Sequence, residues 1–323
     1  MILGSRVRSD CGTLVSRSNS ALLSLIDTAI QSLVDRLEAV CIRGQSWRNR
    51  EAGFSLTTGK TLSSVDDLGP GLSRAGPLMH IAELEAATNL SRPNVIVGVP
   101  EVGLVGTIAA SYLVEQLRLP EIASLESELL PPVVVVRDSE PKPPIRIFGK
   151  DALAVVVSEI PLVSLLSYEF SSQMVAWCKA KRGRMVLGAT GLPSEAKAEA
   201  SSDSKPVVLA VTNDGNMRKS IKAIGAEPFE QGMVAGTYAT LLVRCMSQGV
   251  PNLTLLVESY AMFPDPGAAA AAVQVLSKLL QIAVDVKPLL EGAEEIRLRM
   301  RGLMSQTQEA IQQQAAQTPS VYR

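Results

Sequence analysis

The chain has a single histidine, few aromatic side chains and no paired cysteines, and these shortages exclude several classes of protein. His80 is the only histidine among 323 residues, so a Ser-His-acid or Cys-His catalytic group would depend on it alone. The cysteines are widely spaced, without a C-x-x-C pair or a nearby histidine: Cys11, Cys41, Cys178 and Cys245. We therefore expect reduced thiols and neither a zinc site nor a disulfide framework.

The chain also has no excess of charge of one sign and few long apolar runs. The 31 basic and 32 acidic residues nearly cancel, and no block of like charges stands out, so nucleic acid is not an expected partner. The most apolar stretch near the N-terminus, residues 21–30, is interrupted by Ser24 and Asp27. Elsewhere the sequence has no uncharged apolar run of the length that a membrane-spanning helix requires. The sequence therefore predicts a cytoplasmic protein with no membrane partner.

Two segments resemble phosphate-binding motifs only in part. Gly59-Lys60-Thr61 lacks the glycine that a P-loop carries five residues earlier, where this chain has Phe54. Residues 98–106 are expected at a strand-to-helix turn, but a dinucleotide fingerprint requires glycine at the position of Glu101, whose charge would repel a pyrophosphate. We therefore predict no cofactor and interpret this segment as a tight turn built on four residues: Gly98, Pro100, Gly103 and Gly106.

Apolar runs alternate with helical patterns after Met79. β-branched runs predict strands at 95–99, 133–136, 145–148, 152–157, 185–187, 207–211 and 253–257. Helices are expected at 104–117, 166–177, 217–224, 234–248 and 267–283. This alternation predicts an α/β sandwich of three layers around a mixed, largely parallel sheet over residues 79–286. Residues 1–78, rich in Ser, Arg and Gly, are expected to form a poorly ordered extension.

A last helix is predicted over residues 287–311. Its apolar and small residues follow a heptad spacing: Leu289, Ala293, Ile296, Met300, Leu303, Thr307 and Ala310. Glu295 and Arg299 are spaced to form an ion pair on the solvent side. Such a stripe packs either on its own domain or against another subunit, and the spacing does not decide between them.

The last twelve residues, 312–323, predict a flexible tail. Residues 312–320 are rich in glutamine, with Thr318, Pro319 and Ser320, and cannot bury a core, so they would hold Val321-Tyr322-Arg323 away from the body. A cationic pocket on a partner can bind a terminal carboxylate, while Tyr322 offers a rigid aromatic contact and Val321 fills an apolar slot. The sequence therefore predicts partner binding through Val321, Tyr322 and Arg323, and no catalytic residues.

Residues 94–290 resemble the proteasome assembly chaperone 2 (PAC2) family in its archaeal branch. The first half of the resemblance lies in Val95-Ile-Val-Gly98-x-Pro100, followed by Gly103-Leu104-Val105-Gly106. The second half lies in Gly232-x-x-x-Gly236-Thr-Tyr238, Gly249-Val-Pro251, Leu255-x-x-Glu258 and Pro264-Asp265-Pro266-x-Ala268-Ala269. Glu101 departs from the pattern, because family members usually have glycine there.

The resemblance implies a fold similar to nucleoside phosphorylases without their chemistry, homo-oligomerisation, and ATP-independent help in assembling proteasome α-subunits. Archaeal members commonly end in a hydrophobic-Tyr-any (HbYX) tail that inserts between α-subunits of the core particle, and Val321-Tyr322-Arg323 fits this pattern. Assembly, gate opening, an adaptor role and action with a paralogue stay open. The alternative from another class is a nucleoside- or nucleotide-binding α/β enzyme, which the fold and the glycine turn suggest.

Overall fold

The computed structural model describes residues 79–85, 87, 90–194 and 205–317. The expected extension over residues 1–78 and the end of the tail, with Val321, Tyr322 and Arg323, lie outside the described residues. Residues 195–204 lie outside them as well.

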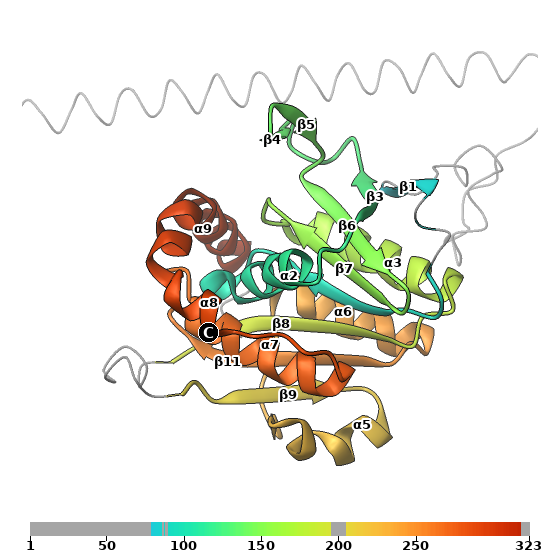
Figure 1. Cartoon of the computed structure of the whole chain (residues 1–323), viewed down its shortest axis with the longest axis vertical. Coiled ribbons are helices and arrows are strands. Elements are labelled where there is room, and N and C mark those ends of the chain that lie inside the picture. Colours follow the sequence, from blue (N-terminus) through green and yellow to red (C-terminus); the bar gives the residue numbers. More distant parts are fainter. Residues whose placement is uncertain (1–78, 86, 88–89, 195–204, 318–323) are drawn as a thin grey trace, which may run out of the picture. The chain divides into compact units, whose positions relative to one another are not determined.

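A nine-stranded mixed sheet runs through the described part of the chain (Figure 1). Its strands are β1 (His80–Glu83), β2 (Asn94–Gly98), β3 (Glu121–Glu126), β6 (Ile145–Lys150), β7 (Leu153–Ser158), β8 (Met185–Pro193), β9 (Val208–Thr212), β10 (Glu227–Pro228) and β11 (Asn252–Ser259). Their spatial order is β1-β3-β6-β7-β2-β8-β11-β9-β10. The four central strands β7, β2, β8 and β11 are parallel, and antiparallel pairs flank them on both sides. The predicted mixed, largely parallel α/β sheet is therefore confirmed.

Helices cover both faces of this sheet (Figure 1). They are η3 (Val102–Leu104), α2 (Val105–Gln116), α3 (Ser164–Ala180), α5 (Gly215–Ser220), η4 (Lys222–Ile224), α6 (Gly236–Gln248), α7 (Pro266–Leu280), α8 (Lys287–Glu291) and α9 (Ala293–Gln317). Side chains alternate between the faces of each strand, so Ile96 packs with α2 and α7 while Val95 and Val97 pack with α3 and α6. Two apolar cores result, one on each side of the sheet.

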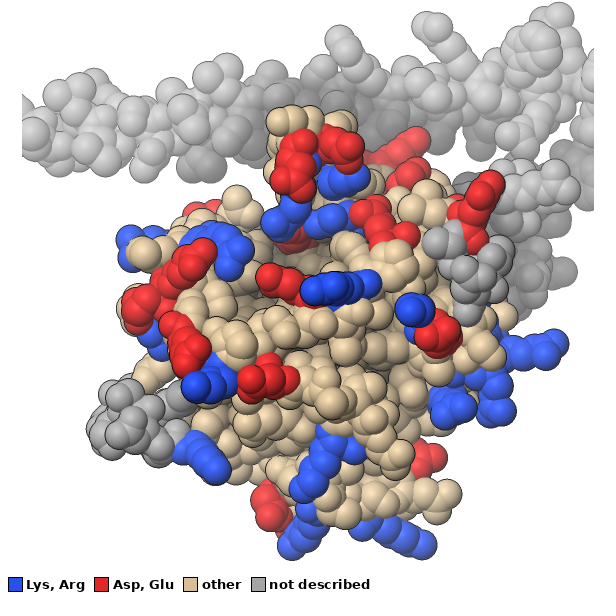
Figure 2. All heavy atoms as spheres, viewed as in Figure 1, with Lys and Arg blue, Asp and Glu red and all other residues tan. Residues whose placement is uncertain are grey.

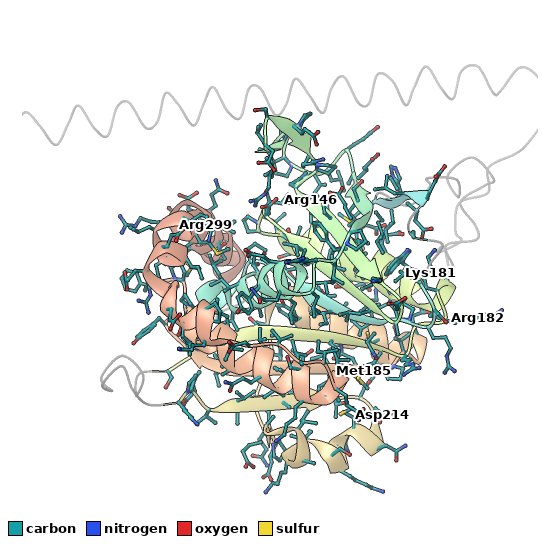
Figure 3. The ribbon with its side chains drawn as sticks, in the orientation of Figure 1. Arg146, Lys181, Arg182, Met185, Asp214 and Arg299 are labelled. Atoms are coloured by element: carbon teal, nitrogen blue, oxygen red, sulfur yellow. The ribbon has the colours of Figure 1, made fainter. Side chains whose placement is uncertain are left out.

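Side-chain caps begin two of these helices. Asp214 accepts a hydrogen bond of 2.7 Å from the Met217 amide and begins α5 (Figure 3). Asp265 performs the same role for α7, where Pro266 occupies the first turn. Arg182, two residues after α3 ends at Ala180, has a left-handed conformation with φ of 52°.

Strand β8 is three times as long as the sequence predicted, because it continues through two glycines. A Cβ on Gly188 would collide with the Tyr238 ring, and a Cβ on Gly191 would collide with the Val102 carbonyl and the Ser259 side chain. Glycine inside a strand commonly marks such a close approach. The glycines therefore let α6 and the turn before α2 pack directly on the sheet.

The segment between residues 133 and 145 also differs from the prediction. The sequence predicted a strand at 133–136, but β4 (Val135–Arg137) pairs with β5 (Glu140–Lys142) as a separate hairpin. Asp138 and Ser139 have φ of 52° and 67°, the left-handed pair that a two-residue hairpin turn requires. The hairpin lies apart from the main sheet in Figure 1.

The heptad stripe of the last helix packs on its own domain. Leu289, Met304 and Thr307 are buried, and Ile296, Met300 and Leu303 are partly buried against the core that contains α2 and α7. Of the two alternatives for the stripe, the structure therefore shows packing within the chain. Gly292 separates α8 from α9, so the single predicted helix consists of two.

Candidate functional site

The glycine turn between β2 and α2 holds the helix against the sheet. A Cβ on Gly98 would collide with the Ala110 side chain and the Gly106 carbonyl, and one on Gly106 with the Tyr238 hydroxyl. Gly103 has φ of 63°, a left-handed conformation that favours glycine, and Pro100 is buried. The backbone at the end of β2 and helix α2 therefore lie close together at this turn. Neighbouring side chains fill the space around it.

Tyr238, on α6, joins this turn to the other face of the sheet. Its hydroxyl donates to the Val97 carbonyl at 3.1 Å and accepts from the Val99 amide at 3.1 Å, although the two positions are about 140 residues away. The side chain is fully buried, and burial raises the pKa of its hydroxyl. Tyr238 therefore supplies hydrogen bonds to two backbone groups at the end of β2.

Glu101 provides the second link from the turn to α6. Its Oε1 accepts from the Thr237 amide at 2.5 Å, and its Oε2 accepts from the Thr190 hydroxyl at 3.1 Å. Ala235, the residue before α6, supplies no side-chain cap, so the Glu101 carboxylate caps this helix from a distant part of the chain. Gly236 has φ of 77°, and a Cβ there would collide with the carboxylate.

Burial raises the pKa of Glu101 from 4.5 to about 7, whereas hydrogen bonds from Thr237 and Thr190 oppose the shift. A helix N-terminus favours negative charge. In many nucleotide-binding proteins the bound phosphate lies at a helix N-terminus for this reason. Here the carboxylate of the chain itself occupies it. Glu101, which seemed a departure from the motif, therefore fills the anion position at the start of α6.

The segment from Pro264 to Pro266 ties the start of α7 to the same turn. The Asp265 carboxylate accepts from the Ala268 amide at 2.9 Å and from the Tyr260 amide at 3.1 Å. The Asp265 amide in turn donates to the Gly103 carbonyl at 2.8 Å, and Pro264 is buried. Residues from the two halves of the predicted motif thus meet at one end of the parallel strands.

Glu258 and Gly232 lie apart from this cluster. Glu258 accepts from the Val207 amide at 3.2 Å and from the Ser194 hydroxyl at 3.4 Å, beside the loop that leads into β9. Gly232 has φ of 148°, and a Cβ there would collide with the Phe229 ring. Both residues therefore have local structural contacts.

Sequence reasoning missed an exposed apolar surface on α3 and α6. Four large side chains on the outer sides of these neighbouring helices are 48–64% exposed: Leu165, Tyr168, Val243 and Met246. The Arg244 guanidinium lies 3.9 Å from the centre of the Tyr168 ring. The outward spacing of these residues was present in the sequence, but only the pairing of α3 with α6 places them on one surface, here called the α3–α6 face.

His80, Cys178 and Cys245 are residues of types that often take part in catalysis or metal binding. His80 contacts Glu126 at 3.3 Å, with both side chains exposed, and burial raises the pKa of the Cys178 and Cys245 thiols to about 11 and about 12. Within residues 79–317, apart from the gaps given above, no group of three His, Cys, Asp or Glu side chains could hold a metal ion.

Every helix in that part of the chain is too short or too polar to cross a membrane. Acidic and basic side chains are intermixed on the face that carries α2 and α7 (Figure 2).

Helix α9 extends to Gln317, six residues into the segment that was predicted as the flexible tail, and the domain holds part of its length. Thr307 is buried, and the Gln308 amide nitrogen donates to the Met262 carbonyl at 2.9 Å. The helix continues to Gln317, roughly 14 Å beyond Gln308 at the usual helical rise.

Comparison with known proteins shows the family. The model of the PAC2 family matches residues 95–304, more than half of the chain. The structure is similar to that of Pyrococcus furiosus PbaA, described as an archaeal homolog of proteasome-assembly chaperone, with a TM-score of 0.66, 29% sequence identity, and coverage of 72% of this chain and 99% of PbaA.

Two further relatives are more distant. Pyrococcus furiosus PbaB, described as an archaeal proteasome activator, has a TM-score of 0.59 and 22% identity over 71% of this chain and 99% of PbaB. An uncharacterised protein of Methanocaldococcus jannaschii is 24% identical over 222 residues, which cover 69% of this chain and 90% of that protein. At these identities, the likeness to PbaB shows the fold.

We predict that Tyr238→Phe lowers the free energy of unfolding by about 1–3 kcal/mol, because the buried Val99 amide loses its acceptor. Urea unfolding measures the change. Tyr168→Phe, which removes a hydroxyl from an exposed tyrosine, is the matched control and should stay within about 0.5 kcal/mol of the parent. Equal stability of the two variants would contradict the role of the Tyr238 hydroxyl.

We predict a pH-dependent difference between the parent and Glu101→Gln. With a pKa raised from 4.5 to about 7, the folded protein keeps a proton that the unfolded chain has lost between those values. Glu101 therefore makes stability fall as pH rises through this window, by up to about 3 kcal/mol at about 1.4 kcal/mol per pKa unit. The stability of the parent relative to the variant should fall between pH 4.5 and 7 and level off above.

Urea unfolding of both proteins at pH 5 and pH 8 measures this difference. Glu115→Gln, at an exposed position on α2, controls for the general loss of a carboxylate. A parent-to-variant difference that is the same at both pH values would show that Glu101 has the same pKa in the folded and unfolded chain.

Proposed function

Because the chain belongs to the PAC2 family, we propose that it is an ATP-independent proteasome assembly chaperone or activator that acts in the cytoplasm. In this proposal it binds the α-subunits of the proteasome core particle and docks through Val321-Tyr322-Arg323. The observation that carries the proposal is the similarity to PbaA, which extends over 99% of that homolog of a proteasome-assembly chaperone.

The chemistry of the chain's end supports docking through the tail. A cationic pocket between two subunits would bind the terminal carboxylate, an apolar slot would accept Val321, and Tyr322 would supply the large contact. Helix α9 supports the same arrangement, because its packed part is anchored to the domain while its end extends past Gln308. The tail would then be presented at a distance from the α/β body.

The glycine turn counts against the alternative of a nucleoside- or nucleotide-binding enzyme. Such an enzyme would use a free helix N-terminus and open backbone amides to hold phosphate. In this chain the Glu101 carboxylate already accepts from the Thr237 amide, and Tyr238 accepts from the Val99 amide. We therefore favour a binding protein over an enzyme.

We further propose that the protein is a homo-oligomer in which a second copy covers the α3–α6 face. The heptad stripe packs against the core of its own chain and is not available to a second copy. The α3–α6 face, by contrast, exposes four large apolar side chains: Leu165, Tyr168, Val243 and Met246. Arg244 lies beside them, against the Tyr168 ring. An oligomer would present several tails together and so raise avidity far above that of one short peptide.

We predict that Tyr322→Ala lowers the affinity for the core particle by about a hundredfold, because a buried aromatic side chain commonly dominates a small interface. Val321→Asp should also weaken binding, since it places a charge in an apolar slot. Arg323→Ala is the matched control with little effect, because the pocket would bind the backbone carboxylate and leave this side chain in water.

Surface binding of each variant to immobilised core particle, at fixed ionic strength, measures these affinities. One residue added after Arg323 should be nearly as damaging as Tyr322→Ala, because it moves the carboxylate away from its pocket. If Tyr322→Ala binds as tightly as the parent, the tail is not the docking element.

We predict that Leu165→Glu combined with Val243→Glu converts the oligomer to a folded monomer, because each new charge would be buried without a partner. Light scattering after gel filtration measures the mass. Leu298→Glu, at a position 63% exposed on α9, is the control and should leave the oligomer intact. A monomeric parent, or a double variant that keeps the parent's mass, would contradict the proposed interface.

A further inference from the structure

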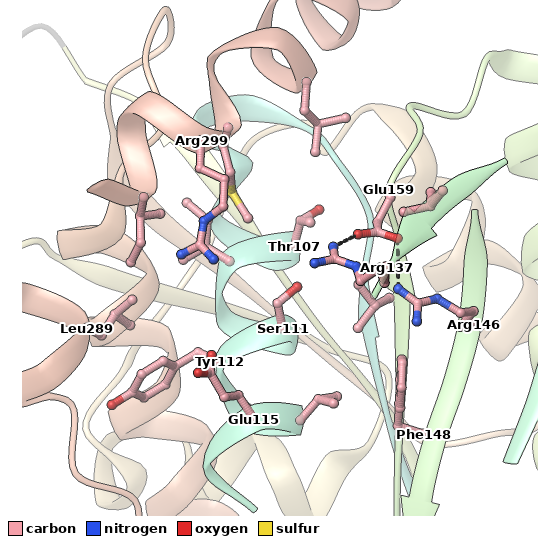
Figure 4. A pocket seen from close by; sticks show the side chains of 17 residues that line it. Thr107, Ser111, Tyr112, Glu115, Arg137, Arg146, Phe148, Glu159, Leu289 and Arg299 are labelled. Atoms are coloured by element: carbon pink, nitrogen blue, oxygen red, sulfur yellow. Dashed lines mark hydrogen bonds and ion pairs between the residues drawn. The ribbon is translucent and has the colours of Figure 1, made fainter. Parts of the chain in front are cut away.

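A cavity of about 510 Å³ lies between α2, the edge of β6 and β7, and the start of α9 (Figure 4). Apolar side chains from all of these elements form its walls: Ile108, Phe148, Val157, Met300 and Leu303. The volume falls within the range of about 300–1,000 Å³ that is typical of small-molecule sites.

One wall carries an ion network. The Glu159 carboxylate accepts from Arg137 and, at 2.8 Å, from Arg146, whose guanidinium also lies 3.6 Å from Glu121. Arg146 is 8% exposed, so this charged group is fixed at the base of the cavity. Both arginines approach the same carboxylate in Figure 4. Arginine offers five N–H donors and no acceptor, so the network leaves donors in excess.

Two polar atoms behind this wall are buried from solvent and have no partner among the described residues. They are the Thr107 hydroxyl, in a residue only 1% exposed, and the Arg146 Nε. The Ser111 hydroxyl, one helical turn after Thr107, faces the cavity (Figure 4). Buried polar groups normally have a hydrogen-bond partner, and an unpaired one requires an explanation.

Arg299 faces the cavity from the opposite side. The sequence predicted an ion pair with Glu295 on the solvent side of α9, but Arg299 makes no ion pair with any residue that the structure describes and instead lines the cavity. Arg299 on α9 and Arg146 on β6 lie on either side of α2 (Figure 3). Glu115 is at an exposed position on the same wall as Ser111.

We propose that this cavity binds a small molecule with an apolar body and a carboxylate head. The apolar walls fit an aliphatic or aromatic body, while Arg299 and the Ser111 hydroxyl fit an acceptor with negative charge. Arg137 and Arg146 are paired with carboxylates, so Arg299 is the cation that disfavours a positively charged head. Because the walls come from α2, the sheet and α9, the bound molecule would hold α9 more firmly on the domain.

Decanoate is a suitable probe, and isothermal calorimetry with the full-length protein measures its affinity and stoichiometry. We expect one decanoate per chain and a higher midpoint of thermal unfolding in its presence. Decylamine has the same alkyl chain with the opposite charge and should bind at least about tenfold more weakly. Acetate, which lacks the apolar body, should not raise the midpoint.

Arg299→Gln should weaken decanoate binding by about tenfold or more, because it removes the charged donor without changing a buried residue. Arg301→Gln is the matched control, since Arg301 is exposed on the same helix but lines a different hollow, and it should bind like the parent. Ser111→Leu, which fills part of the cavity, should also weaken binding.

The proposal is overturned if decanoate does not bind, if decylamine binds as tightly, or if Arg299→Gln and Arg301→Gln bind equally well. None of these measurements involves the proteasome, so their outcome is separate from that of the tail variants.

Discussion

The close approach of α2 to the sheet at the glycine turn governs the arrangement of the whole domain. Only glycine at positions 98 and 106 leaves room for this approach, and Tyr238 reaches from α6 to the backbone at the end of β2. Glu101 adds a second link by capping α6, and Asp265 ties α7 to Gly103. Helices on opposite faces of the sheet are thereby joined at one end of the parallel strands.

Many enzymes with an α/β fold bind phosphate at a glycine-rich turn between a strand and a helix. In such enzymes the helix N-terminus and the glycine-rich backbone are open to a ligand. Here the Glu101 carboxylate occupies the N-terminus of α6, and the Tyr238 hydroxyl accepts from the Val99 amide beside the turn. These motif residues therefore stabilise the scaffold.

The sequence predicted the order and type of most strands and helices, because their apolar patterns are local. It did not predict the length of β8, since Gly188 and Gly191 resemble a strand end until the close approach of Tyr238 and Val102 is known. It also could not assign Glu101, whose partner at Thr237 is 136 residues away.

Two further features depended on packing between distant elements. The α3–α6 face exists only once these two helices lie side by side, and Arg299 faces the cavity only because α9 packs along α2 and the core. The resemblance to the PAC2 family supplied the expected function, and the family match over residues 95–304 confirms the family. The tail residues that carry the proposed docking lie outside the described part of the chain.

Cryo-electron microscopy of this protein bound to the proteasome core particle tests the proposed docking most directly. The account predicts density for Val321, Tyr322 and Arg323 between adjacent α-subunits, with the terminal carboxylate against a basic side chain and the α/β domain outside the ring. A complex in which the α/β domain itself contacts the α-subunits, with no tail density in the pockets between them, would contradict it.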